Sequence, residues 1–206
     1  MLDIFKKKLT IIQLAELIRL FSYELQIKMR GPLDSLIKIY DKEISKTTKD
    51  MCDRELYYLI NSCIYIMLTT NINLKCNKDE LLDHYHAECS KVLHLGCSKE
   101  RGDYAASQLD WRIQAYKLAW ISKELNSLIG IRSIFQSTIS AIIRTNHWDA
   151  ADDTVIEYIN NQDSINNKSN QIALQLPGLI AGPICANIIN AIGKFLSQLP
   201  RNFKII

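Results

Sequence analysis

The sequence predicts an all-α, single-domain bundle of seven to nine helices, with a C-terminal amphipathic helix packed on it. Seven Gly and four Pro in 206 residues are few, whereas sheet proteins need frequent Gly- and Pro-bearing turns. Apolar residues recur at intervals of three and four over most of the chain, which is the period of a helix with one buried face. With 48% hydrophobic and 23% charged residues, the chain can bury a core without disulfides.

Four helices are expected in the first half of the chain. Ile18 and Leu25 lie on the core face of the first one, and Leu20 widens its apolar arc enough to predict a central helix. The Gly31-Pro32 turn ends this helix, because Pro suits the first turn of a following helix. The polar stretch 46–53 is expected to be a linker. The expected helices cover residues 9–28, 32–45, 54–70 and 78–95.

The second half is expected to add two long helices, a capped shorter one and a C-terminal hairpin. Gly130 separates the two long helices, and Asn146 can cap the helix that follows them. We expect residues 1–162 to form the main bundle, 163–169 a polar loop, and 170–206 a helical hairpin and tail packed on the bundle. The remaining expected helices cover 103–128, 131–144, 147 onward, 170–176 and 183–199.

Charge, cysteine usage and the first residues bound the class of protein. The formal net charge is +3 and no basic stripe is visible, so we expect no nucleic-acid partner. Six scattered cysteines do not resemble a disulfide framework. Glu16 and Arg19 interrupt the first apolar run, unlike a signal peptide. A reduced, cytosolic protein is expected, and the Ile, Asn and Lys bias favours a bacterial source.

The uncharged stretch from Ser169 to Gly193 raises the question of a membrane span. A spanning helix needs about 20 mainly apolar residues. Here Asn and Gln side chains intrude, and Pro177 and Pro183 split the run. We therefore expect no transmembrane segment, and an amphipathic docking helix in its place.

Three of the four histidines and two of the six cysteines lie in HYHAECSKVLHLGC, residues 84–97. It contains two His-x-x-Cys pairs, and three-residue spacing places side chains side by side on a helix. The pairs are eight residues apart, about 12 Å along a helix, which is too far for one ion. Leu81, Tyr85 and Cys89 instead share a core face. We expect no metal and no cofactor, although one pair with Cys76 or Cys52 remains an alternative.

The motif Arg144-Thr-Asn-His147 resembles the Arg and His pair of the HEPN ribonucleases, which are also all-helical. The family's usual spacing is four to six intervening residues, and here it is two. The resemblance implies that His147 would act as the base and that Arg144 would stabilise the phosphate charge. The alternative is that Arg144 interacts with a helix C-terminus and His147 begins the next helix.

Asp149, Asp152, Asp153 and Glu157 form an acidic group at the start of that next helix. Di-metal sites in bundles pair Glu with Glu-x-x-His, a motif that this chain lacks. We therefore interpret these acids as complementing the helix dipole.

The helix expected at 103–128 has apolar stripes on two nearly opposite sides. A surface helix has one such stripe, so this helix is either central or has a second face for a partner. Aromatic residues commonly anchor interfaces. The predicted partner-binding residues, which include two on the last helix, are Trp111, Tyr116, Trp120, Ile188 and Phe195.

No Gly-rich phosphate loop, GxSxG, HExxH or CxxC motif occurs. We therefore expect a non-enzymatic protein–protein interaction module, an adaptor or chaperone-like subunit of a cytosolic bacterial complex. A narrower hypothesis is that this complex serves a secretion system. One alternative is a helical nuclease or a metal-dependent enzyme. Another is an immunity or antitoxin protein with one dedicated partner.

Overall fold

Most of the described chain is helical in the computed structural model, which describes residues 7–40, 44–70, 74, 76–121, 127–161 and 176–206. Seven helices and two three-residue strands occur in these residues, and the predicted all-α class is confirmed. The elements are β1 (Lys7–Leu9), α1 (Ile11–Lys38), α2 (Lys46–Thr70), α3 (Lys78–His94), α4 (Lys99–Ile121), α5 (Ser127–Thr145), α6 (Asp149–Asn160), α8 (Leu176–Asn202) and β2 (Phe203–Ile205).

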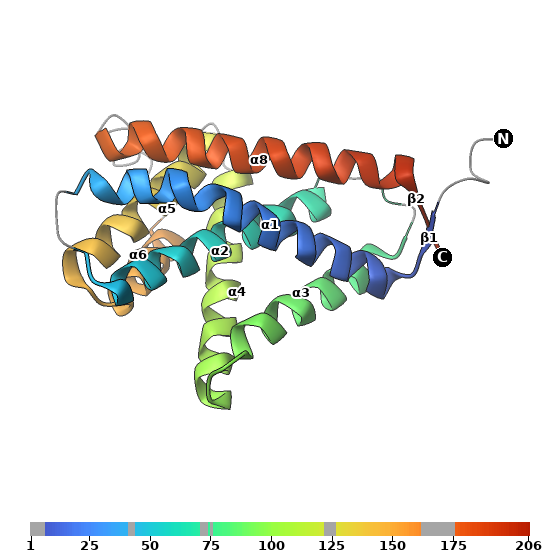
Figure 1. Cartoon of the computed structure of the whole chain (residues 1–206), viewed down its shortest axis with the longest axis horizontal. Coiled ribbons are helices and arrows are strands. Elements are labelled where there is room, and N and C mark those ends of the chain that lie inside the picture. Colours follow the sequence, from blue (N-terminus) through green and yellow to red (C-terminus); the bar gives the residue numbers. More distant parts are fainter. Residues whose placement is uncertain (1–6, 41–43, 71–73, 75, 122–126, 162–175) are drawn as a thin grey trace.

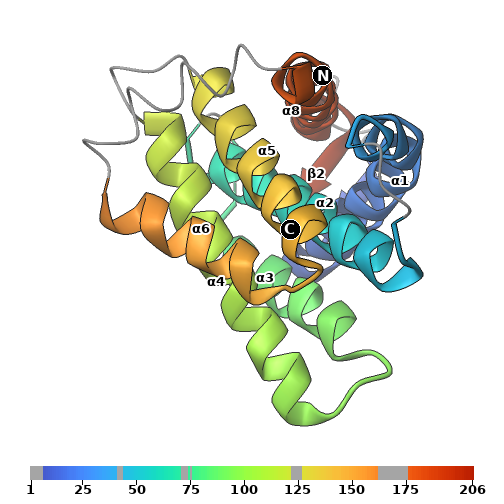
Figure 2. The same ribbon diagram turned by 90° about the vertical axis from the view of Figure 1, so that its left-hand side faces the viewer.

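The central helix is α2, not the first helix as the sequence suggested. It packs against α1, α3, α4, α5 and α8, and 15 of its 25 residues are buried. Seen along the bundle in Figure 2, α1 and α8 lie to one side of α2, with α4, α5 and α6 to the other. The hairpin of α3 and α4 projects from the bundle (Figure 1). The first helix therefore lies at an edge, with Leu20 exposed.

Helix α1 is longer than expected because it does not end at Gly31-Pro32. Pro inside a helix removes one hydrogen bond, and its ring normally crowds the preceding residue's Cβ. Gly31 has no Cβ, which relieves part of that clash. Leu33, Leu36 and Ile37 are buried beyond the proline, and their burial offsets the lost hydrogen bond. The predicted break at this point was wrong.

Helix α2 begins at Lys46, so the predicted linker at 46–53 is helical. The backbone N–H of Thr48 donates to Oγ of Ser45 at 3.0 Å, which satisfies one of the free amides of the first turn. Cys52 is fully buried within this segment. The cap residue was visible in the sequence, but the polar composition of 46–53 obscured it.

Gly130 lies inside α5 and does not separate two helices. A Cβ at this position would lie 3.0 Å from Cβ of Ala119 in α4. The small Gly130 and Ala119 side chains therefore let α4 and α5 approach closely. The chain that joins these two helices, residues 122–126, lies outside the described part.

Asn146 ends α5 and does not cap α6. Its φ is +57°, the left-handed conformation that commonly terminates helices. Its side-chain oxygen accepts hydrogen bonds from Thr48 and Ser45, so it ties the end of α5 to the start of α2. Helix α6 begins after Trp148, which provides no side-chain cap.

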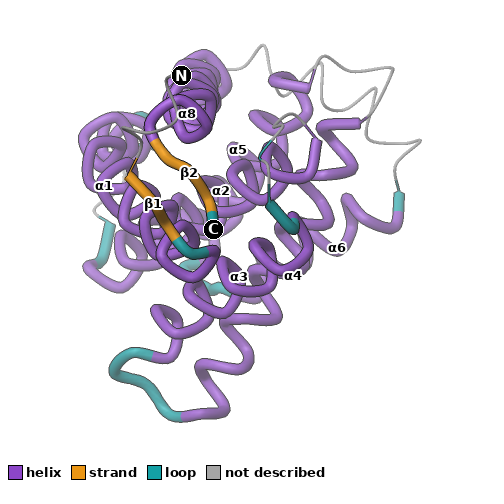
Figure 3. The backbone as a smooth tube through the Cα atoms, turned by 90° about the vertical axis from the view of Figure 1, so that its right-hand side faces the viewer, coloured by secondary structure: helices purple, strands orange, loops and turns teal. Residues whose placement is uncertain are grey.

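A short parallel pair of strands joins the two ends of the described chain. Lys7 is paired with Phe203 and Leu9 with Ile205, and Figure 3 shows both strands beside the ends of α1 and α8. The N–H of Ile206 extends the pairing by donating to the carbonyl of Leu9 at 2.9 Å. Three-residue strands lack the alternating pattern needed to predict them from sequence.

Helix α8 lies along α1 and also packs on α2 and α5. The rings of Phe21 and Phe195 stack with centroids 3.9 Å apart. The segment Ile180–Asn202 is the one helix in the described residues that is long and apolar enough to span a membrane. Its Ile184, Ile188 and Ile192 side chains are buried against the bundle. The predicted loop at 163–169 and helix at 170–176 fall almost wholly outside the described residues.

Candidate functional site

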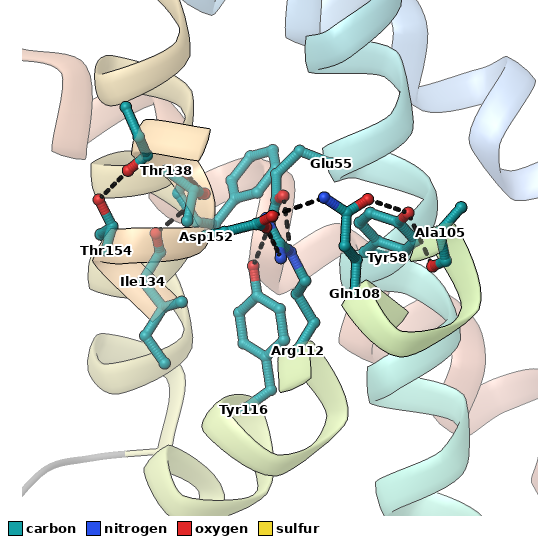
Figure 4. A network of polar contacts seen from close by, with 12 residues as sticks. Glu55, Tyr58, Ala105, Gln108, Arg112, Tyr116, Ile134, Thr138, Asp152 and Thr154 are labelled. Atoms are coloured by element: carbon teal, nitrogen blue, oxygen red, sulfur yellow. Dashed lines mark hydrogen bonds and ion pairs between the residues drawn. The ribbon is translucent and has the colours of Figure 1, made fainter. Parts of the chain in front are cut away.

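A cluster of charged side chains is buried between α2, α4 and α6 (Figure 4). Arg112 of α4 donates from Nε to Oε2 of Glu55 in α2 at 3.0 Å. Its Nη1 donates to Asp152 of α6. All three side chains are buried, so one guanidinium joins three helices away from water.

Four neutral side chains add hydrogen bonds to this buried cluster. Gln108 Nε2 and Tyr104 Oη donate to Oδ2 of Asp152 at 2.6 and 2.7 Å. Oη of Tyr116 lies 3.4 Å from Oε1 of Glu55. Oη of Tyr58 lies 3.0 Å from the carbonyl of Ala105 and 3.1 Å from Oε1 of Gln108. Both carboxylates therefore have several donors.

Aromatic rings cover the rest of the guanidinium. Cζ of Arg112 lies 5.2 Å from the ring centroid of Tyr58 and 5.3 Å from that of Trp148. Nη2 of Arg112 and Nε1 of Trp148 are buried without a hydrogen-bond partner. Attraction between the cation and the two ring faces partly replaces the missing hydrogen bonds.

Burial sets the electrostatics of the cluster. Desolvation raises the pKa of the Glu55 carboxyl above its usual value, and the charge of Arg112 opposes this only in part. The hydrogen bond to Asp152, followed by desolvation, raises the pKa of Tyr104 to about 12. Tyr104 is exposed and Trp148 is half-buried, whereas the other side chains of the cluster are buried. The cluster is therefore closed to a substrate in this conformation, and it holds three helices in register.

The sequence did not predict this cluster. It indicated Asp152 only as an acid that complements the helix dipole. Asp149 and Asp153 are exposed near the start of α6, as dipole-complementing acids would be. Asp152 is buried and ion-paired. A signal was available, because Gln108 and Arg112 share the core face of α4 with Leu109 and Tyr116. A search for apolar stripes alone does not detect polar residues on a buried helix face.

The His84–Cys97 segment forms α3 and the turn after it. Cys89 is buried, and its Sγ lies 3.4 Å from Oδ1 of Asn61; burial raises its thiol pKa to about 11. Nε2 of His86 lies 2.8 Å from Asp110, and Nε2 of His94 lies 3.0 Å from Asp103. Both histidines therefore link α3 to α4. Among the residues described, no group of three His, Cys, Asp or Glu side chains is placed to hold a metal.

The two residues that resemble the HEPN pair have separate partners. Nε of Arg144 donates to the carbonyl of Ser140 at 3.2 Å, within its own helix. The backbone N–H of His147 donates to Oγ1 of Thr145. Both residues are exposed, and no hydrogen bond or ion pair joins them to each other in the described structure. Arg144 lies in the last turn of α5, as the alternative interpretation expects, but His147 does not begin the next helix, because α6 starts at Asp149.

The five predicted partner-binding residues are not gathered on one surface. Tyr116 and Ile188 are fully buried, so in this conformation they contribute to packing. Phe195 is half-buried and stacks on Phe21. Trp111 and Trp120 are also half-buried, and the Trp111 ring contacts Tyr104 edge to face. Binding by the two tryptophans stays a prediction.

The largest run of exposed apolar side chains lies on α1. Ile12 is 52% exposed, Leu20 49%, Tyr23 55% and Ile27 46%. At about 100° per residue they fall within an arc of about 80°, opposite the buried Leu14, Ile18 and Leu25. We call the part of this face from residue 12 to residue 30 the outer seam, which comprises Ile12, Glu16, Leu20, Tyr23, Ile27 and Arg30. The exposed Asp34 continues the same face one turn beyond Arg30.

The outer seam has the spacing of a helix-pairing surface. Its members are separated by three or four residues, the spacing of the apolar positions in a coiled coil. Glu16 and Arg30 lie toward its two ends, and the apolar Leu20, Tyr23 and Ile27 lie between them. Arg30 donates to Asp53 of α2 at 2.8 Å, yet half of its side chain remains exposed.

No protein-family model, no curated protein and no solved structure matches this chain. Function is therefore inferred from the chain's own side chains.

Proposed function

We propose that this chain is a non-enzymatic interaction protein, an adaptor or chaperone-like subunit, that binds an amphipathic helix along the outer seam of α1. The observation that carries the proposal is the exposure of Leu20, Tyr23 and Ile27 on one face of an edge helix. Large apolar side chains gathered on a surface mark binding sites more often than isolated ones do.

The spacing and charges of the seam support a helical partner. Recognition of one amphipathic helix by another uses apolar anchors three and four residues apart. Glu16 and Arg30 carry opposite charges, so they favour a partner helix with the reverse order of charges. This specifies an orientation as well as a shape.

The buried Glu55–Arg112–Asp152 cluster supports a binding function in a different way. It fixes α2, α4 and α6 with charge-assisted hydrogen bonds between Arg112 and the two carboxylates. The bundle that carries the seam therefore has a defined shape, and a preformed surface loses less entropy on binding.

The test is affinity capture with the chain as bait, using Leu20→Asp with Ile27→Asp as the seam variant. Ile156→Asp, on the exposed face of α6, is the matched control. We expect the wild type and the control to capture a stoichiometric partner. The seam variant should capture at least about tenfold less of it, because a buried unpaired charge opposes binding.

The outcomes separate the classes. Several partners that depend on the seam indicate an adaptor, and a single partner encoded next to this chain indicates an immunity or antitoxin protein. Capture that is unchanged by the seam variant would contradict binding at α1. A circular dichroism spectrum that matches the wild type shows that the variant is folded.

A further inference from the structure

We propose that the helix bound by the outer seam is α1 of a second copy of this chain, in an antiparallel arrangement with its two-fold axis at Tyr23. This inference rests on the proposed binding role of α1. It follows from the self-complementarity of the seam, since a two-fold interface requires one surface to match itself.

The apolar residues of the seam match each other when two copies run antiparallel. With Tyr23 on the axis, each Tyr23 contacts its counterpart. Leu20 and Ile27 lie three residues before and four residues after it, so Leu20 of one copy meets Ile27 of the other. The two-fold axis repeats that contact, and all three exposed apolar side chains at the middle of the seam are then covered.

The charges of the seam match in the same register. Glu16 lies seven residues before Tyr23 and Arg30 lies seven residues after it. Glu16 of one copy therefore lies opposite Arg30 of the other, twice per dimer. A parallel pair would place Glu16 against Glu16 and Arg30 against Arg30, which like charges disfavour. The charges thus select the antiparallel orientation.

The size of the contact sets the expected strength. From Glu16 to Arg30 the seam is about 21 Å long at 1.5 Å per residue. A pair of helices of this length covers less than the roughly 1,200 Å² of a standard interface. We therefore expect a reversible dimer with a dissociation constant on the order of micromolar.

The first experiment is sedimentation equilibrium on the purified full chain over a concentration series. We expect a monomer–dimer equilibrium for the wild type. Glu16→Arg should weaken the dimer at least about tenfold, because it places like charges opposite each other. Adding Arg30→Glu and Asp53→Asn to Glu16→Arg should restore dimerisation, since the exchanged charges are again complementary. Asp53→Asn removes the carboxylate that pairs with Arg30 in the wild type, so that the new glutamate faces no like charge within its own chain.

The second experiment maps the axis by cross-linking with a short bismaleimide. In a background that carries Cys97→Ser and Cys76→Ser, which removes the native thiols that are not buried, two copies of Tyr23→Cys should cross-link, because packed helix axes are about 8–10 Å apart. The matched control is Ile12→Cys, at an equally exposed position. Its two copies would be about 33 Å apart, because position 12 is eleven residues from the axis at 1.5 Å per residue, and should not cross-link.

The results distinguish this inference from the proposed function. A monomer at every concentration, with capture of another protein that depends on the seam, overturns the self-association and leaves the binding function standing. Dimerisation with cross-linking at Tyr23 but no other partner supports the self-association and contradicts the adaptor role. Cross-linking at Ile12 in preference to Tyr23 rules out the antiparallel register.

Discussion

At the scale of single residues, Arg112 is the side chain on which most other contacts depend. It joins Glu55 and Asp152, and it lies against the rings of Tyr58 and Trp148. Burying a charge of this kind costs desolvation free energy, so the ion pairs add little net stability. Removing one partner is nevertheless strongly destabilising, because the remaining charge stays buried without compensation. Removing the guanidinium would leave two buried carboxylates without a cation.

We expect Arg112→Met to lower the free energy of unfolding by about 3–5 kcal/mol, the usual cost of leaving a buried partner uncompensated. Lys117→Met, on the exposed side of the same helix, should change it by less than about 0.5 kcal/mol. Urea denaturation followed by circular dichroism measures both. Equal stability of wild type and Arg112→Met would mean that the cluster does not hold the helices together.

Glu55 gives a prediction about pH. Its carboxyl pKa is raised in the folded chain, chiefly by burial, so between the unfolded and folded pKa values the folded state binds more protons. Its contribution to stability is therefore fully present below about pH 4.5, the ordinary value, and falls as the pH rises through the folded pKa. Glu55→Gln removes this titration.

The measurement is the difference in unfolding free energy between wild type and Glu55→Gln from pH 4 to 8. We expect the variant to become more stable relative to the wild type as the pH rises. Other carboxyl groups titrate in both proteins and largely cancel in the difference. If the wild type becomes more stable relative to the variant as the pH rises, the pKa of Glu55 is lowered and not raised in the folded chain.

At the scale of elements, the helices are set by burial where local signals conflict with it. Helix α1 continues through Pro32 because Leu33, Leu36 and Ile37 reach the core beyond it. Helix α5 continues through Gly130 because the missing Cβ allows contact with Ala119. In both cases, packing of the helix against its neighbours stabilises a residue that the sequence predicted as a helix boundary.

Pro32→Ala should therefore stabilise the chain. Alanine restores a backbone donor and removes the ring's clash with the carbonyl four residues earlier, a change worth roughly 1–3 kcal/mol. Glu24→Ala, at an exposed position of the same helix, is the matched control and should have little effect. Thermal unfolding of both variants tests this, and a lower melting temperature for Pro32→Ala would show that the proline itself supports α1.

At the scale of the whole molecule, the fold class could be predicted from the sequence but the neighbours of each helix could not. Periodicity identified the core side of α3, with Leu81, Tyr85 and Cys89 buried as expected. It could not show that α2 is central, because a helix buried on all sides carries no single stripe. Periodicity also could not identify the partners of Arg112, since Glu55 and Asp152 are 57 and 40 residues away in the sequence.

The candidate surface was predictable only in part. Leu20 was visible as an apolar residue off the core face of the first helix, but its exposure depends on which elements cover α1. Tyr116 lies on an apolar stripe of α4 and Ile188 on the apolar face of α8, and these stripes predict both as interface residues. Both are core residues, and residue type alone does not separate an anchor from a core position.

The pairing of β1 with β2 has a consequence during synthesis of the chain. The paired residues Lys7 and Phe203 are 196 positions apart, so at roughly 5–20 residues per second the second strand is made about 10–40 s after the first. The core face of α1 also remains uncovered until α8 is made, because α8 supplies Phe195, which stacks on Phe21. An apolar helix and an unpaired strand thus stay exposed on the nascent chain until residues 203–205 have left the ribosome, and a factor that shields them during that interval would raise the yield of folded protein.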